Sequence, residues 1–97
     1  MLILTTIDEA LLILQEECVE VAYVANKAIR FGLNDMHPET FKINREVLEK
    51  EVGHILAMVY VLTAQGVLRV DKIEEGKLHK LEKLRRWSTV YATEPIL

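Results

Sequence analysis

The chain has 97 residues, of which 51% are hydrophobic and only 6% aromatic, with four glycines and two prolines. A chain of this length forms one domain with a small core that oligomerisation would help to stabilise, and this composition disfavours a β fold with many turns. The formal charge of −3 gives no overall attraction to nucleic acid or to an anionic membrane, so we expect neither as a partner.

The expected location is the cytoplasm. Cys18 is the only cysteine, which excludes an intrachain disulfide and fits a reducing compartment. The N-terminus has no basic region of the kind that opens a signal peptide. The most apolar segment, residues 55–64, is too short to span a bilayer.

The first predicted helix begins at a capping box formed by Thr6 and Glu9 and ends at Phe31, where Gly32 is expected to take a left-handed cap. Its apolar residues recur at steps of three and four and predict one core-facing stripe. Glu17 lies roughly 90° from the centre of this stripe, where it would face a neighbouring helix. The stripe consists of Ile7, Leu11, Leu14, Cys18, Val21, Ala22, Ala25 and Ile29.

The second predicted helix follows a loop over residues 33–43, is capped by Asn44, and ends at Gln65 and Gly66. Beyond His54 it is apolar on almost every side, so a partner subunit is expected to cover it, most simply in a two-fold dimer. Its inward stripe is Leu48, Val52, Ile55, Val59 and Leu62.

A third helical segment is predicted to start near Asp71 and to break at Gly76, with a longer helix from Lys77. Leu78, Leu81, Leu84 and Trp87 form its apolar edge. The predicted architecture is therefore an all-α bundle of three to four helices per chain, spanning residues 1–97 as a single domain and completed by homo-oligomerisation.

Two short strips carry the candidate chemistry. Glu17 and Glu20 are three residues apart on the first helix, and Glu51 and His54 repeat this spacing on the second. Both pairs have apolar residues one turn before and after them, where an unpaired charge is costly. Helices packed side by side would offer up to four ligands to one divalent cation, and Mg²⁺ with a nucleotide is the expected pairing. The alternative is a solvated acidic face.

These residues resemble a known family. The pattern Glu16-Glu17-x-x-Glu20, followed after a loop by Glu51-x-x-His54, is similar to that of the MazG-like nucleotide pyrophosphohydrolases of the all-α NTP pyrophosphatase superfamily. The segments 30–32 and 80–87 also resemble its small, often phage-encoded members, and the resemblance covers about residues 7–87.

The resemblance implies a helical homodimer or homotetramer that hydrolyses nucleoside triphosphates, NTP or dNTP, to a monophosphate and pyrophosphate with Mg²⁺, and so controls the nucleotide pool. It would act in the bacterial cytoplasm, or in that of the host if phage-encoded. Carried over by position, the metal ligands are Glu17, Glu20 and Glu51, with His54 where the family usually has Asp. Glu16 is a possible additional acid.

The histidine at position 54 leaves three interpretations open. The chain is an active enzyme that rests on three glutamates, an enzyme whose metal preference is shifted towards Mn²⁺ or another transition metal, or a catalytically impaired homologue that binds nucleotides or mediates interactions. Imidazole carries no negative charge when neutral and is a softer ligand than carboxylate, so Mg²⁺ binding should weaken.

The mechanistic hypothesis is attack on a phosphorus of the triphosphate by a water that the metal polarises and that Glu17 or Glu20 deprotonates. The outer phosphates would be held by basic residues of the third helix, although a solvated helix face is the alternative for each of them. These residues are Lys77, Lys80, Lys83 and Arg86.

Two other classes are open. Glu51-x-x-His54 has the form of the Glu-x-x-His element in di-iron carboxylate bundles, which a homodimer would supply twice. A helical dimer that only mediates interactions would use the same acids as surface charge.

Overall fold

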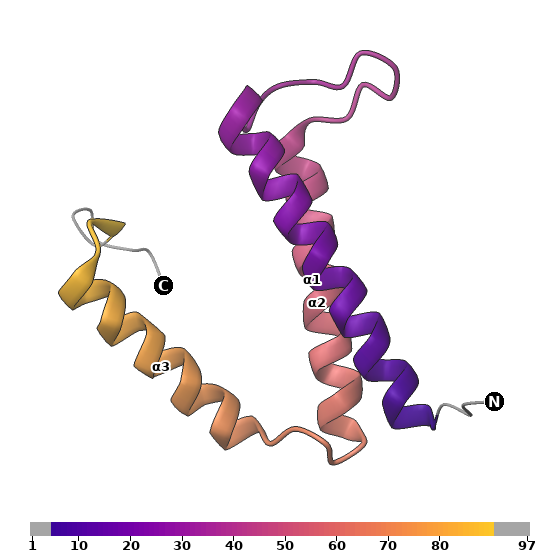
Figure 1. Cartoon of the computed structure of the whole chain (residues 1–97), viewed down its shortest axis with the longest axis vertical. Coiled ribbons are helices and arrows are strands. Elements are labelled where there is room, and N and C mark those ends of the chain that lie inside the picture. The colour runs from indigo at the N-terminus through magenta and orange to yellow at the C-terminus, as the bar shows by residue number, and fades with distance from the viewer. Residues whose placement is uncertain (1–4, 91–97) are drawn as a thin grey trace. The chain divides into compact units, whose positions relative to one another are not determined.

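The computed structural model describes residues 5–90 and has three helices in that range: α1 (Thr6–Phe31), α2 (Asn44–Ala64) and α3 (Val70–Trp87) (Figure 1). The prediction of an all-α chain is confirmed. The chain divides into two compact units, one built on α1 and α2 and ending at Val67, the other beginning at Leu68 and containing α3. A single domain, a closed bundle and homo-oligomerisation remain predictions.

Helix α1 begins one residue earlier in its capping box than predicted. Thr5, not Thr6, is the N-cap, and its hydroxyl accepts a hydrogen bond from the Asp8 amide at 3.0 Å. The Asp8 carboxylate in turn accepts from the Thr5 amide at 3.1 Å and from the Thr5 hydroxyl at 2.8 Å. Two adjacent threonines, each followed three residues later by an acid, make both registers possible in the sequence, and the Thr5–Asp8 register satisfies both backbone donors.

A side-chain hydrogen bond joins the two ends of the α1–α2 connection. Helix α1 ends at Phe31 as predicted, but Gly32 has φ 104° and ψ 148°, an extended glycine conformation instead of the predicted left-handed cap. Asn44 is not the cap of α2, because Ile43 takes that position. The Asn44 side chain is buried and donates to the Gly32 carbonyl oxygen at 2.9 Å, so it joins the start of α2 to the end of α1.

Histidine 37 organises the loop between these ends. Its Nδ1 accepts hydrogen bonds from the amides of Glu39 and Thr40 at 3.1 and 3.2 Å. Its own amide donates to the Lys42 carbonyl oxygen, and its carbonyl oxygen accepts from the Phe41 amide. The loop is therefore a defined turn around one imidazole, in which Phe41 is held at φ 60°.

Helices α1 and α2 run antiparallel and pack side by side (Figure 1). On each helix, a series of buried and half-buried positions recurs at alternating steps of four and three, as in a coiled-coil seam. On α1 the seam positions are Ala10, Leu14, Glu17, Val21, Val24 and Ala28. On α2 they are Asn44, Leu48, Glu51, Ile55, Met58 and Leu62.

The predicted core stripe of α1 is therefore rotated about 70° from the packed face, at 100° per residue. Leu14, Val21 and Ala25 are half-buried, whereas the rest of that stripe is exposed. The physical reason is that α1 is apolar on both faces, so hydrophobic periodicity does not decide which one meets α2. The exposed members are Ile7, Leu11, Cys18, Ala22 and Ile29.

The predicted stripe of α2 is closer to the observed one. Leu48, Ile55, Val59 and Leu62 are half-buried or buried, and Val52 is exposed. With Leu56 and Tyr60, Val52 forms an exposed apolar line at four-residue spacing. Within the described residues these three side chains are exposed. They lie on the helix that the predicted partner subunit would cover.

Helix α3 is continuous through Gly76, so the predicted break there is wrong. One glycine costs an exposed helix roughly 1 kcal/mol, which the surrounding Lys, Glu and Leu residues offset. Leu81 and Leu84 are half-buried, whereas Leu78 and Trp87 are exposed. Within residues 5–90, no helix combines the length and apolar character needed to cross a bilayer.

Candidate metal centre

Glu17 and Glu51 lie at the middle of the seam between α1 and α2. Glu17 follows Leu14 and precedes Val21, and Glu51 stands between Leu48 and Ile55 in the equivalent series on α2. Their side chains retain 22% and 15% of their full exposure. Two carboxylates are therefore held among apolar residues at positions where a coiled-coil seam ordinarily places aliphatic side chains.

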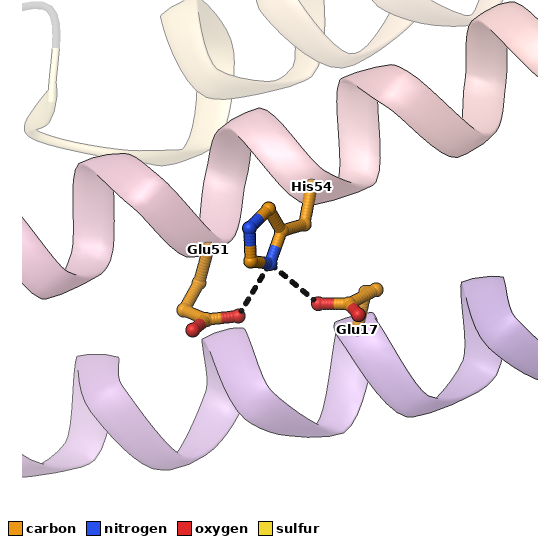
Figure 2. A network of polar contacts seen from close by, with 3 residues as sticks. All are labelled: Glu17, Glu51 and His54. Atoms are coloured by element: carbon orange, nitrogen blue, oxygen red, sulfur yellow. Dashed lines mark hydrogen bonds and ion pairs between the residues drawn. The ribbon is translucent and has the colours of Figure 1, made fainter.

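His54 joins the two carboxylates. Its Nδ1 lies 3.1 Å from Oε2 of Glu17 and 3.2 Å from Oε2 of Glu51 (Figure 2). Glu51 is one turn before His54 on α2, whereas Glu17 reaches the imidazole from α1 (Figure 2). The imidazole is the most open of the three groups, with 45% of its side chain exposed.

The three groups of this cluster carry a negative net charge. Two half-buried carboxylates repel each other, and one imidazole Nδ1 can share a single proton between them. A protonated His54 leaves the three groups with a net charge of about −1, and a neutral one with about −2. A divalent cation bound to both carboxylates and to the neutral imidazole would balance the charge of about −2 and replace the shared proton with three metal–ligand bonds.

The donor set fits a divalent ion. One ligand atom from each of Glu17, Glu51 and His54 lies within 4.8 Å of the other two. The distances of 3.1 and 3.2 Å from His54 Nδ1 are close to the ~3.0 Å that separates neighbouring ligands around an octahedral ion with bonds of about 2.1 Å. Two carboxylates and one imidazole are donors that Mn²⁺, Fe²⁺ and Zn²⁺ accept readily, and Mg²⁺ less readily at the nitrogen.

The other predicted acids lie outside this cluster. Glu20 is one turn beyond Glu17 on α1 and is exposed, and Glu16 is exposed as well. Among the described residues, the group of at least three close ligand atoms consists of Glu17, Glu51 and His54. The sequence pattern thus included all three members of this group. It also included Glu20, which lies about 60° around the helix from Glu17 and so points away from the seam.

The predicted phosphate-binding residues all lie on α3, in the second unit. Lys77 is 3.9 Å from Glu74, and Arg86 is 3.5 Å from Glu82, both within the helix. Lys80 and Lys83 are exposed on the same helix. Their role in binding phosphate stays a prediction.

A cavity in the first unit was not predicted. It has a volume of about 220 Å³ and is lined by Lys42, Glu46, Val47 and Lys50. The sequence indicates only that one lining residue is close to the candidate ligands. Lys50 directly precedes Glu51 and is one turn before His54 on α2. The contribution of Lys42 comes from the loop conformation, which periodicity does not reveal.

Comparison with models of protein families, with curated proteins and with solved structures finds no match to this chain. A function must therefore be inferred from the residues themselves, chiefly from the Glu17–His54–Glu51 cluster and from the resemblance of the acidic motifs to those of MazG-like enzymes.

Proposed function

We propose that this protein is a nucleoside triphosphate pyrophosphohydrolase that depends on a divalent cation, Mg²⁺ or Mn²⁺, and converts an NTP or dNTP into its monophosphate and pyrophosphate. The observation that carries the proposal is the convergence of Glu17, Glu51 and His54 from two helices (Figure 2). The resemblance of the same motifs to MazG-like enzymes supplies the class of substrate.

The cluster has the properties that such a reaction needs. Its carboxylates are held by opposite helices of one hairpin, so their spacing is fixed by helix packing and not by a loop. His54 remains 45% exposed, which leaves a path for a substrate to reach the ion. Bound there, the cation would neutralise phosphate oxygens and acidify a water.

Glu20 is the proposed general base. It is exposed one turn from Glu17 and takes no part in the cluster, so its carboxylate is available to accept a proton. The water oxygen bonds to the α-phosphorus, the bond from that phosphorus to the bridging oxygen of the β-phosphate breaks, and pyrophosphate leaves. The water proton goes to Glu20, while Glu17 and Glu51 would remain ionised and hold the cation.

A homodimer or homotetramer is part of this proposal. Ile7, Leu11 and Ile29 on α1 are exposed, and so are Leu56 and Tyr60 on α2. Burial of large apolar side chains stabilises a protein by about 1.5–3 kcal/mol each, so a second copy covering these lines would add substantially to a small core.

The deciding experiment is incubation with a panel of ribo- and deoxyribonucleoside triphosphates and either Mg²⁺ or Mn²⁺, followed by chromatography of the products. Monophosphate and pyrophosphate are expected. Diphosphate with orthophosphate would contradict the proposed bond cleavage. Binding without turnover would identify the catalytically impaired homologue.

Two matched variants link the reaction to the cluster. Glu51→Gln removes one of the three ligands and should abolish both turnover and the stabilisation by Mn²⁺, which for a single site reaches about 2.7 kcal/mol at a hundredfold excess over Kd. Glu49→Gln removes an exposed carboxylate two residues away on α2 and should leave both unchanged. Equal effects of the two variants would exclude the cluster as the metal site.

The di-iron carboxylate bundle is the second candidate. Glu17 with Glu51-x-x-His54 is half of the ligand set of such centres, which take a single Glu from each of two helices and Glu-x-x-His from each of the other two. Addition of Fe²⁺ in air would then give a new near-ultraviolet absorbance with two irons per dimer, and the absence of that band would exclude this candidate.

A further inference from the structure

The first unit also contains a cavity lined by Lys42, Glu46, Val47 and Lys50, in which basic side chains outnumber acidic ones. In the described part of the chain, the ammonium groups of Lys42 and Lys50 form no ion pair or hydrogen bond with another side chain. With Glu46 as the one acid, the lining carries a net charge of about +1.

The backbone that presents Lys42 is fixed. Its amide donates to the Thr40 hydroxyl at 3.4 Å, and its carbonyl oxygen accepts from the His37 amide at 2.9 Å. Because the loop is held in this way, a ligand that meets Lys42 need order only its side chain. The cavity is much larger than the space that one water requires, so it can admit a phosphate group.

The cavity and the carboxylate cluster share one face of α2. Val47 is four residues before Glu51, and Lys50 is four residues before His54, so these two lining residues each lie one turn from a cluster residue. One turn advances about 5.4 Å along the helix. A polyphosphate chain is long enough to contact an ion at the cluster and a lysine one turn away.

We propose that Lys42 and Lys50 hold the terminal phosphates of the substrate while the cluster binds the metal beside the phosphate that reacts. This rests on the proposed function, and it moves the phosphate site from α3 to the cavity beside the cluster. Val47 is the apolar residue of the lining, and the carboxylate of Glu46 would limit how many negative charges the cavity accepts.

The test measures binding of the Mn²⁺ complex of inorganic triphosphate by calorimetry, which requires no turnover. Loss of one charge-assisted contact corresponds to about tenfold weaker binding, so Lys42→Gln and Lys50→Gln should each raise Kd by roughly that factor. Lys42→Arg should restore most of the affinity. Lys80→Gln and Lys83→Gln, at the positions that the sequence favoured, should have the wild-type Kd.

Two further readouts separate this proposal from the hydrolase proposal. The melting-temperature shift caused by Mn²⁺ alone should be unchanged in Lys42→Gln and Lys50→Gln, because neither is a metal ligand. A wild type that binds Mn²⁺–triphosphate through these lysines yet hydrolyses no nucleotide supports the cavity site and overturns the hydrolase. If both lysine variants hydrolyse nucleotide with an unchanged KM, the cavity site is overturned and the hydrolase proposal is retained. The same conclusion follows if KM rises only in Lys80→Gln and Lys83→Gln on α3.

Discussion

The imidazole Nδ1 of His54 lies 3.1 Å from a carboxylate oxygen of Glu17, a residue 37 positions earlier in the chain. The contact crosses the seam between α1 and α2, and Glu51 approaches the same nitrogen from the other side at 3.2 Å. The fourth position of the acidic motif is thus occupied by a nitrogen donor directed at the two carboxylates. In the proposed metal centre, His54 would therefore be the ligand that sets the preference among metal ions.

Replacement of His54 by Asp tests that preference. His54→Asp adds a hard, charged oxygen ligand, so Mg²⁺ affinity should rise by at least about tenfold, because even a surface-like charge pair at 4 Å is worth several kcal/mol. The metal-free protein should become less stable, since a third carboxylate joins two that already repel each other. Thermal melting with and without Mg²⁺ and Mn²⁺ measures both effects.

His79→Asp is the matched control for this substitution. His79 is exposed on α3, and the same change of residue there should alter neither the metal-free melting temperature by much nor the response to metals. An unchanged Mg²⁺ response in His54→Asp would place position 54 outside the metal coordination sphere.

The convergence of Glu17, Glu51 and His54 was predictable from the sequence. Glu17 with Glu20, and Glu51 with His54, are spaced three residues apart between apolar neighbours on two successive helices. The packed face of α1 was not, since Leu11 and Ile29 look as suitable for burial as Val21 and Val24. Which apolar face meets α2 is decided by how the hairpin closes, and that is a tertiary property.

The closure of the hairpin depends on side chains with no periodic signal. Asn44 reads as a helix cap, because asparagine is common at that position, but its amide instead reaches back to the Gly32 carbonyl oxygen. His37 belongs to no periodic pattern, and it accepts two backbone hydrogen bonds inside the loop. Such contacts form only once the chain has turned, so local sequence rules do not reach them.

Asn44→Ala should destabilise the hairpin. The side chain is 8% exposed and is the donor to the Gly32 carbonyl oxygen, so its removal leaves an acceptor without its partner at a typical cost of about 1–3 kcal/mol. Urea unfolding followed by far-ultraviolet circular dichroism measures the loss. Asn34→Ala is the control, because Asn34 is exposed and accepts only from the Arg45 side chain at 3.2–3.3 Å. Equal losses in the two variants would contradict the role of Asn44.

Phe41→Gly should stabilise the protein slightly. Phe41 has φ 60° and is 70% exposed, so glycine relieves a left-handed backbone that costs an L-residue about 1–2 kcal/mol and gives up little burial. The larger backbone entropy of glycine in the unfolded chain offsets part of this gain, which leaves about 0.5 kcal/mol. Phe31→Gly, in helical backbone at the end of α1, should instead destabilise, and a loss of stability in both variants would show that the Phe41 ring contributes packing.

The capping box of α1 should make stability depend on pH in the acid range. The hydrogen bond from the Thr5 amide, and then that from the Thr5 hydroxyl, holds the pKa of Asp8 below its ordinary value. Because the folded pKa lies below the unfolded value of about 3.9, this contribution is complete above that pH and is lost as the pH falls through the folded pKa. Urea unfolding from pH 6 down to pH 3 should therefore show a decline that is shallower in Asp8→Asn, which has no carboxylate to protonate. Thr5→Ala keeps the backbone donor and should fall between the two. Parallel curves for the wild type and Asp8→Asn would mean that the Asp8 carboxylate is not stabilised by the box.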